Sequence, residues 1–276
     1  MEALCALGAE RGVPVSSLTT FKIGGPALLT LCTGDTKKLQ QALTLCREGY
    51  IPCALVGNGS NILGPDEGFN GLLLKLENQT QPPVFEGCLL RAGAGISLTL
   101  LARESLRRGL KGLERLCGIP GTLGGAIAMN AGAYGGEMKD VIKWVKVLDK
   151  DGNVRKLDIS ELDMGYRTSR IAKEGMIVLQ MCIGLFIGTS EEISLIMQML
   201  MQKRKAKQPL EFPSAGSTFK RPEGYFAGKL IEDAGLKGYR VGGAMVSEKH
   251  CGFVINYSNA TATDVLQVIN DVEKTV

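Results

Sequence analysis

A glycine-rich stretch at residues 117–136 constrains this chain more than any other feature. It reads CGIPGTLGGAIAMNAGAYGG and holds seven glycines, one proline and no charged residue. Glycines at this frequency disfavour both helix and sheet, because each loses much backbone freedom on folding. The apolar residues between them, Ile119, Leu123, Ile127 and Met129, predict that the segment is buried. Buried backbone polar groups need partners, so we expect the backbone here to approach a large, flat, polar ligand.

The composition is that of an ordinary globular protein. With 276 residues, 45% hydrophobic and 22% charged, the chain can bury a large core, and its length suits one to three domains. Lys and Arg exceed Asp and Glu by only 32 to 28, too little to indicate nucleic acid or a membrane surface. No secretory signal is recognised, and the most apolar run, 176–187, is too short for a membrane span. We expect a soluble, cytoplasmic protein.

The eight cysteines do not form a disulfide pattern. They are scattered without a CxxC pair, mostly in apolar segments such as LTLC and LQMC. This usage is typical of a reducing cytosol. The single histidine, His250, makes a clustered zinc site unexpected. Cys251 follows it, but no partner supports a thiol–imidazole pair, and we expect His250 to be structural or to face a substrate.

Periodicity and turn residues predict alternating strands and helices. The expected strands lie at 27–32, 51–56, 71–76, 88–95 and 176–186, with a hairpin at 141–158 turning at Asp151-Gly152. The expected helices lie at 36–49, 97–109, 189–209 and 262–275. The segment TQPPV at 80–84 is a candidate boundary. We expect three parts, at 1–79, 80–189 and 190–276.

A second glycine-rich loop, GNGSN at 57–61, follows a predicted strand. Its backbone amides and the side chains of Asn58, Ser60 and Asn61 are suited to hold a phosphate or pyrophosphate without cations. It is neither a GxGxxG fingerprint, because Ile62 replaces the third glycine, nor a P-loop. By itself the loop is explained equally well as a plain β-turn.

Further segments accompany these two loops along the chain. They read TTFKIGGPA (19–27), YRTSR (166–170), KQPLEFPSAGSTFKRP (207–222), FAGKLIEDAGLKGYRVGGAMVSEKHCGFVIN (226–256) and NATATDV (259–265). Together with both glycine-rich loops, and in this order, they resemble the UDP-N-acetylenolpyruvoylglucosamine reductases, the MurB-type flavoenzymes of peptidoglycan synthesis. The resemblance covers nearly the whole chain and is closest to the shorter, type II branch.

The resemblance implies a fold and an activity. The fold is α+β, with a two-domain FAD-binding unit of the vanillyl-alcohol-oxidase/PCMH type and a third α+β substrate-binding domain. The activity is reduction of UDP-N-acetylglucosamine enolpyruvate to UDP-N-acetylmuramate, with NADPH as hydride donor and FAD bound non-covalently. A cytoplasmic monomer with this activity serves cell-wall synthesis, and through it cell shape and division.

The resemblance also assigns site residues by matching motif positions. It implies that Arg167 holds the substrate carboxylate and that Ser217 donates a proton, while Tyr134, Lys207 and Arg221 bind substrate. Without the resemblance, Arg167 reads as an exposed loop arginine and Ser217 as a turn former. Lys207 likewise reads as a cation that complements a helix end. The implied cofactor-binding residues are Gly57, Asn58, Gly59, Ser60, Asn61, Ile119, Pro120, Gly121, Gly124, Gly125, Asn130, Gly132, Ala133 and Ile177.

One departure and two alternatives stay open. The family pattern continues with a strand that carries a catalytic glutamate, whereas this sequence ends at Val276. The chain is then either truncated or catalytically impaired, and we expect truncation because every other motif is retained. No residue here is assigned that glutamate's role. The first alternative is another oxidoreductase of the same flavin fold, acting on an alcohol or hydroxy acid. The second is a flavin- or nucleotide-binding module without catalysis.

Overall fold

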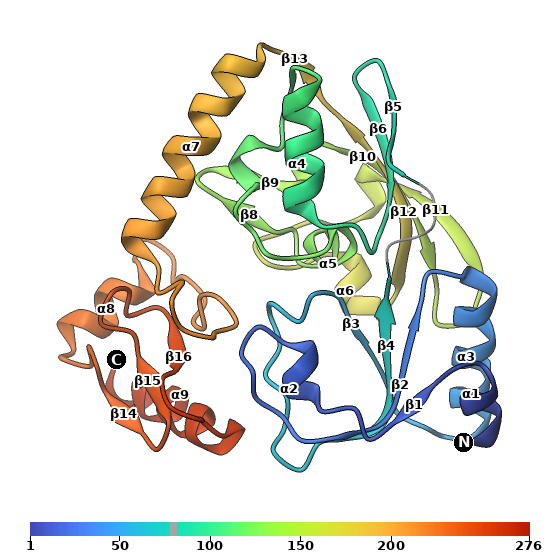
Figure 1. Cartoon of the computed structure of the whole chain (residues 1–276). Coiled ribbons are helices and arrows are strands. Elements are labelled where there is room, and N and C mark those ends of the chain that lie inside the picture. The colour runs from blue at the N-terminus through green and yellow to red at the C-terminus, as the bar shows by residue number, and fades with distance from the viewer. Residues whose placement is uncertain (78–81) are drawn as a thin grey trace. The chain divides into compact units, whose positions relative to one another are not determined.

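The computed structural model describes residues 1–77 and 82–276, which divide into two compact units (Figure 1). Unit 1 comprises residues 1–9, 31–57 and 73–202, and unit 2 comprises residues 10–30, 58–72 and 203–276. The boundary predicted near residues 79–80 lies outside the described residues, and the division into three domains stays a prediction.

A four-stranded sheet contains the first strands of the chain, in the order β1-β2-β4-β3. The division between the units falls within β2 and β4. The predicted strands at 27–32, 51–56 and 71–76 and the predicted helix at 36–49 are confirmed. The elements of this region are α1 (Glu2–Ala6), β1 (Glu10–Arg11), α2 (Val15–Leu18), β2 (Ala27–Thr33), α3 (Thr36–Glu48), β3 (Cys53–Val56) and β4 (Phe69–Leu76).

Unit 1 contains a five-stranded antiparallel sheet with the order β11-β10-β12-β6-β5. The predicted hairpin is confirmed, with Gly152 at φ 87° in its turn. The strand predicted at 176–186 is also confirmed as β12. It lies in the middle of the sheet, where Met181 and Ile183 are fully buried. The strands are β5 (Val84–Glu86), β6 (Leu89–Gly93), β10 (Ile142–Leu148), β11 (Val154–Asp158) and β12 (Ile177–Gly184).

Short elements and two longer helices complete unit 1. Helix α5 packs on β12, and Leu101 of α4 and Leu123 of α5 are fully buried in the same core. The remaining elements are α4 (Leu98–Arg107), β7 (Leu110–Lys111), α5 (Leu123–Ala128), β8 (Gly132–Ala133), β9 (Gly136–Glu137), α6 (Arg170–Glu174) and β13 (Phe186–Ile187), followed by α7 (Ser190–Lys207), whose last turn belongs to unit 2.

The expectation that residues 117–136 form neither helix nor sheet is wrong. Helix α5 begins directly after Thr122, whose hydroxyl accepts a hydrogen bond of 3.3 Å from the amide of Gly125. Strands β8 and β9 then pair as a short antiparallel ribbon. The apolar residues between the glycines explain the helix, because Leu123 and Ile127 are both fully buried. Tertiary packing therefore outweighs the low helix propensity of glycine.

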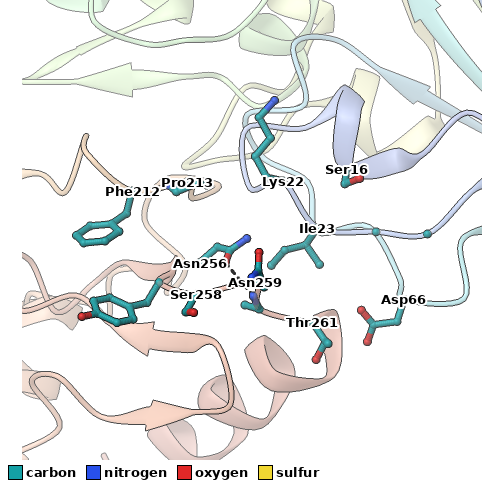
Figure 2. Close-up of a pocket in the computed structure, with 14 residues that line it drawn as sticks. Ser16, Lys22, Ile23, Asp66, Phe212, Pro213, Asn256, Ser258, Asn259 and Thr261 are labelled. Atoms are coloured by element: carbon teal, nitrogen blue, oxygen red, sulfur yellow. Dashed lines mark hydrogen bonds between the residues drawn. The ribbon is translucent and has the colours of Figure 1, made fainter.

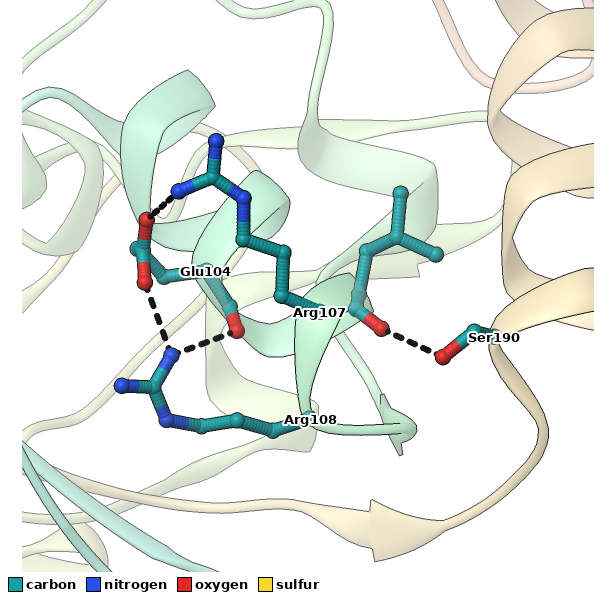
Figure 3. A network of polar contacts seen from close by, with 5 residues as sticks. Glu104, Arg107, Arg108 and Ser190 are labelled. Carbon is teal, nitrogen blue, oxygen red and sulfur yellow. Dashed lines mark hydrogen bonds and ion pairs between the residues drawn. The ribbon is translucent and has the colours of Figure 1, made fainter.

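A polar network joins α4 to the start of α7 within unit 1 (Figure 3). Glu104 accepts hydrogen bonds from Arg107 at 2.5 Å and from Arg108 at 2.7 Å. The hydroxyl of Ser190 donates to the carbonyl of Leu106 at 3.0 Å. Thr189 caps α7, because its hydroxyl accepts a hydrogen bond of 3.2 Å from the amide of Glu192. Exposed ion pairs add little stability, so the Ser190 bond to α4 and the Thr189 cap are what fix where α7 begins.

Unit 2 is an α+β structure with a three-stranded antiparallel sheet in the order β14-β15-β16. Helix α9 packs on this sheet, and Val246, Val254 and Val268 are fully buried between them. The predicted helix at 262–275 is confirmed. The elements are α8 (Ala227–Asp233), β14 (Arg240–Val241), β15 (Ala244–Val246), β16 (Val254–Asn256) and α9 (Ala262–Thr275).

Asp66 ties a loop of unit 2 to the N-terminus of α9. Its carboxylate accepts hydrogen bonds from the amides of Ala262 and Thr263, at 2.6 and 2.9 Å. The Thr263 hydroxyl donates to it at 2.8 Å. A carboxylate at this end of a helix satisfies free amides and complements the helix dipole.

Within residues 1–77 and 82–276, none of the helices combines the length and apolar composition of a membrane-spanning segment. The same part of the chain holds no cluster of three or more His, Cys, Asp or Glu side chains suited to a metal ion.

Replacing Asp66 with Ala should lower the free energy of unfolding by about 1 kcal/mol, a typical value for losing a helix cap. Burial raises the pKa of Asp66, but hydrogen bonds from the Ala262 and Thr263 amides outweigh it and hold the pKa below its usual value. The contribution is therefore complete above the unfolded-state pKa of about 4 and is lost as pH falls through the lower folded-state pKa.

Urea unfolding of both proteins between neutral and strongly acidic pH measures this difference. Glu67→Ala is the matched control, because Glu67 is the neighbouring exposed carboxylate. A difference between the Asp66 variant and the unmodified protein that persists undiminished in strong acid would contradict the role of the charge.

Candidate active site

The first residue of the GNGSN loop contacts the longer glycine-rich stretch within unit 1. Gly57 lies at the end of β3, and a Cβ atom placed on it would collide with the hydroxyl of Thr122. Thr122 is 5% exposed and is the N-cap of α5. Glycine is therefore required at residue 57 so that the end of β3 can approach the start of α5.

The glycines of residues 117–136 serve packing as well as a ligand. A Cβ atom on Gly124 would lie 2.8 Å from that of Ala94, and one on Gly132 would lie 2.8 Å from Cγ of Glu137. The first amides of α5 are also engaged within the protein. Leu123 donates to the carbonyl of Ile96 and Gly124 to that of Ala94, both at 2.8 Å. A ligand therefore has fewer donors here than the sequence suggests.

The rest of the GNGSN loop belongs to unit 2 and forms a fixed turn. Gly59 is buried with φ 61°, and a Cβ atom there would collide with the carbonyl of Leu18. Its own carbonyl accepts a hydrogen bond of 3.1 Å from the amide of Thr20. Among the described residues, no protein acceptor pairs with the amides of Ser60 and Asn61. Adjacent unpaired amides in a rigid turn match the oxygens of a phosphate, so the turn fits the pyrophosphate of FAD.

Three predicted site residues of unit 1 have left-handed backbones that residues other than glycine rarely adopt. Asn130 has φ 40°, Tyr134 has φ 53° and Arg167 has φ 54°. Such conformations cost energy and concentrate at functional sites. The Arg167 guanidinium donates to the carbonyl of Gly132 at 2.8 Å and lies 5.3 Å from the ring centre of Tyr166.

Tyr134 and Asn130 differ in their exposure. Tyr134 is 41% exposed, and its carbonyl accepts a hydrogen bond of 3.2 Å from Arg115. Asn130 is fully buried, and its amide group donates to Glu137 at 3.1 Å and to the carbonyl of Gly165 at 2.9 Å. The Asn130 side chain thus acts within the protein, and its cofactor contact stays a prediction.

The other predicted cofactor residues of unit 1 have mixed surroundings. Ile119 is half-buried against the core, Pro120 is exposed, and Ala133 is half-buried in β8. Gly125 is exposed on α5, whereas Ile177 is buried where β12 begins. Their contact with FAD stays a prediction, as does that of Gly121, whose carbonyl accepts from the amide of Leu98.

Ser217 is exposed in unit 2, on a loop that its neighbour anchors. The amide of Thr218 donates to the carbonyl of Gly252 at 2.8 Å. The Thr218 hydroxyl accepts from the amide of Val254 at 3.2 Å. These bonds fix the backbone beside Ser217 while its side chain faces outward. The loop thereby presents a hydroxyl from a defined position.

Two predicted substrate cations also belong to unit 2. The Arg221 guanidinium lies 4.5 Å from the ring centre of Phe226, and Lys207 is the exposed last residue of α7.

His250 is half-buried, and its Nδ1 accepts from the amide of Gly252 at 3.1 Å. Burial lowers the pKa of His250, and the charge of Lys207 lowers it further. A neutral His250 with its Nδ1 engaged supports a structural or substrate-side role.

A cavity of about 660 Å³ lies within unit 2, and none of the predicted site residues lines it (Figure 2). Phe212 and Tyr257 stack at one side, with ring centres 5.5 Å apart, and Asp66 lies at the other. The side chain of Asn256 lines the cavity and donates a hydrogen bond of 3.2 Å to the carbonyl of Phe21. The TTFKIGGPA and NATATDV segments contribute to this cavity, although no binding role is predicted for them from the sequence. Its lining residues are Ser16, Lys22–Gly25, Asp66, Phe212, Pro213 and Asn256–Thr261.

Sequence comparison identifies relatives over more than nine-tenths of the chain. Residues 27–158 match the FAD binding domain family, and residues 208–276 match the C-terminal domain of UDP-N-acetylenolpyruvoylglucosamine reductase. The UDP-N-acetylenolpyruvoylglucosamine reductase of Lachnoclostridium phytofermentans is 51% identical over 95% of this chain and 86% of its own length. That of Alkaliphilus oremlandii is 50% identical over 93% of this chain and 84% of its own length.

Structural comparison gives the same assignment. The crystal structure of UDP-N-acetylenolpyruvylglucosamine reductase (MurB) from Thermus caldophilus superposes with a TM-score of 0.87 and 39% sequence identity. The match covers 97% of this chain and 95% of that one.

Gly57→Ala should weaken FAD binding by about tenfold or more, because the added methyl group pushes β3 away from Thr122. Titration of the apoprotein with FAD, followed by flavin fluorescence, measures the dissociation constant. Combining Gly57→Ala with Thr122→Ala removes the colliding hydroxyl and should restore most of the affinity. Unchanged affinity in Gly57→Ala alone would show that this close approach is not needed for the cofactor.

Proposed function

This chain belongs to the UDP-N-acetylenolpyruvoylglucosamine reductase family, and we propose that Arg167 and Ser217 act on the substrate in its reaction. The protein is an FAD-dependent oxidoreductase that reduces UDP-N-acetylglucosamine enolpyruvate to UDP-N-acetylmuramate in peptidoglycan synthesis, with NADPH as hydride donor. The predicted family, α+β flavoenzyme fold and activity are therefore confirmed.

The predicted residues of both glycine-rich loops would hold FAD. When bound, this cofactor carries the electrons from NADPH to the enolpyruvyl group. The amides of Ser60 and Asn61 are suited to its pyrophosphate, and the backbone of residues 117–136 to its flat ring. Gly57 contributes by allowing the end of β3 to lie against Thr122.

The fixed guanidinium of Arg167 is the observation on which the substrate role depends. Its left-handed backbone and its bond to Gly132 hold one edge of the fork in place. No carboxylate of the described residues lies within ion-pair distance of it. The planar guanidinium of Arg167 can therefore receive the substrate carboxylate. There it would stabilise the negative charge that develops beside C2 of the enolpyruvyl group during reduction.

Ser217 would deliver the proton that completes the reduction at C2. Its exposed hydroxyl stands on a loop anchored through Thr218, so its position does not depend on the substrate. A positioned donor is what general acid catalysis requires. Lys207 and Arg221 would bind the diphosphate of the UDP group by charge-assisted hydrogen bonds, and Tyr134 would contact the substrate.

We also propose that the protein works in the cytoplasm. None of its eight cysteines, which all lie within the described residues, forms a disulfide, and this suits a reducing compartment. Its monomeric state stays a prediction.

FAD should be released completely when the protein is precipitated with acid, because no motif of the sequence indicates a covalent flavin link. Chromatography of the supernatant should identify the intact dinucleotide. Yellow pellets, or a protein that stays colourless after incubation with FAD, would contradict the cofactor assignment.

Ser217→Ala should leave the reduction of the bound flavin by NADPH almost unchanged and should slow its reoxidation by substrate. General acid catalysis contributes roughly 10²–10⁴-fold, so the two half-reactions should separate clearly in stopped-flow absorbance. Ser160→Ala is the control, since Ser160 is an exposed serine of unit 1 outside the predicted site. Equal losses in both half-reactions would instead assign Ser217 a role in packing or in placing the flavin.

A further inference from the structure

Arg167 occupies a tight turn that the protein holds from both ends. The amide of Gly165 donates to the carbonyl of Thr168 at 3.0 Å, and the Thr168 amide donates back to Gly165 at 3.4 Å. The hydroxyl of Ser169, just after the turn, is fully buried and donates to the carbonyl of Ala128 at 2.6 Å. These bonds fix the backbone of Arg167. The direction of its side chain depends on the groups around the guanidinium, of which the carbonyl of Gly132 is one.

The side chain of Glu137 and the guanidinium of Arg167 both lie beside Gly132. In the β8–β9 ribbon, Glu137 pairs directly with Gly132, whose carbonyl accepts the hydrogen bond from Arg167. A Cβ atom added to Gly132 would lie 2.8 Å from Cγ of Glu137 and 3.3 Å from Nη1 of Arg167. The absence of a side chain at residue 132 thus lets the carboxylate and the guanidinium approach across one glycine.

The carboxylate of Glu137 is itself held by two donors. The Asn130 amide group donates to its Oε2 at 3.1 Å, and the Lys139 ammonium lies 2.8 Å from the same oxygen. These contacts, with that of Lys139 the stronger, hold the pKa of Glu137 below its usual value, and the charge of Arg167 lowers it further. Glu137 is therefore ionised at neutral pH, and its charge acts on Arg167.

Asn130 links this carboxylate to the turn that carries Arg167. The same amide group that donates to Glu137 also donates to Gly165, the first residue of the turn. Its carbonyl oxygen accepts from the amide of Lys139 at 3.0 Å. One buried side chain thus fixes the distance between the Glu137 segment and the Arg167 turn.

We propose that Glu137 is a positioning residue for Arg167, holding the guanidinium against the β8–β9 ribbon so that it is ready for the substrate carboxylate. This inference rests on the proposed role of Arg167. Lys139 is part of the arrangement, because its ammonium pairs with Glu137 at 2.8 Å and offsets part of the carboxylate charge. Arg167 is then oriented by Glu137 without being captured in a full ion pair, and the substrate carboxylate can compete for the fork.

The first test is Glu137→Gln, which keeps the shape and an acceptor for Asn130 but removes the charge. We expect about tenfold weaker binding of the enolpyruvyl substrate to the oxidised protein, measured by calorimetry, because the empty fork is no longer oriented. Reduction by NADPH and the dissociation constant of FAD should stay within about twofold. Glu174→Gln is the matched control, since Glu174 pairs with Arg170 on the exposed surface of unit 1.

A double-mutant cycle with Arg167→Lys separates positioning from a general structural effect. If Glu137 acts through Arg167, Glu137→Gln should weaken substrate binding much less in the Arg167→Lys background than alone. Losses that simply add would overturn the inference while leaving the role of Arg167 intact. If Arg167→Lys alone binds and reduces substrate normally, the proposed function of Arg167 is wrong instead.

Lys139→Met keeps the inference testable even if Glu137→Gln unfolds, because Lys139 is an exposed residue whose loss leaves the core intact. With its counter-charge removed, Glu137 should draw Arg167 into a closer pair and weaken substrate binding several-fold. Adding Glu137→Gln to Lys139→Met should cancel that part of the loss. Unchanged substrate affinity in Lys139→Met would overturn the charge balance proposed for this cluster.

Discussion

The buried amide of Asn130 is the interaction on which the arrangement of the candidate site depends. Its side chain is fully covered, and it bonds to Glu137, to the carbonyl of Gly165 and to the amide of Lys139. Leaving a buried amide without partners costs about 1–3 kcal/mol. Moving any of the three segments apart would break one of its bonds and incur this cost, so Asn130 holds them together. The left-handed backbone of Asn130 is sustained by the same bonds.

Two physical demands share the glycines of residues 117–136. Some glycines allow protein segments to touch, as Gly124 does against Ala94 and Gly132 against Glu137. Others leave backbone exposed, as Gly125 does on the outer side of α5. Glycine density alone therefore overstates the ligand surface, because it does not distinguish a close approach to protein from a close approach to cofactor.

The reaction places its main electrostatic demand on cations. The substrate carries a carboxylate and a diphosphate, and the proposed partners are Arg167 for the first and Lys207 and Arg221 for the second. The chain has a net charge of only +4, so these cations act as fixed local donors rather than through an overall basic surface. A guanidinium oriented before the substrate arrives loses less entropy on binding than a mobile side chain.

Local patterns and motifs in the sequence were enough to predict the long regular elements, the cofactor class and the family. Helices α3, α4, α7 and α9 and the hairpin at Gly152 follow from local periodicity, caps and turn residues, and these act over a few neighbouring residues. The formation of α5 inside the glycine-rich stretch depends on long-range contacts, because its first amides donate to the carbonyls of Ala94 and Ile96, which lie on a separate segment. The left-handed backbone of Arg167 and the pairing of Glu137 with Gly132 likewise arise from the tertiary structure, and no local pattern encodes them. These features depend on contacts between residues far apart in the chain, where propensity and spacing carry no information.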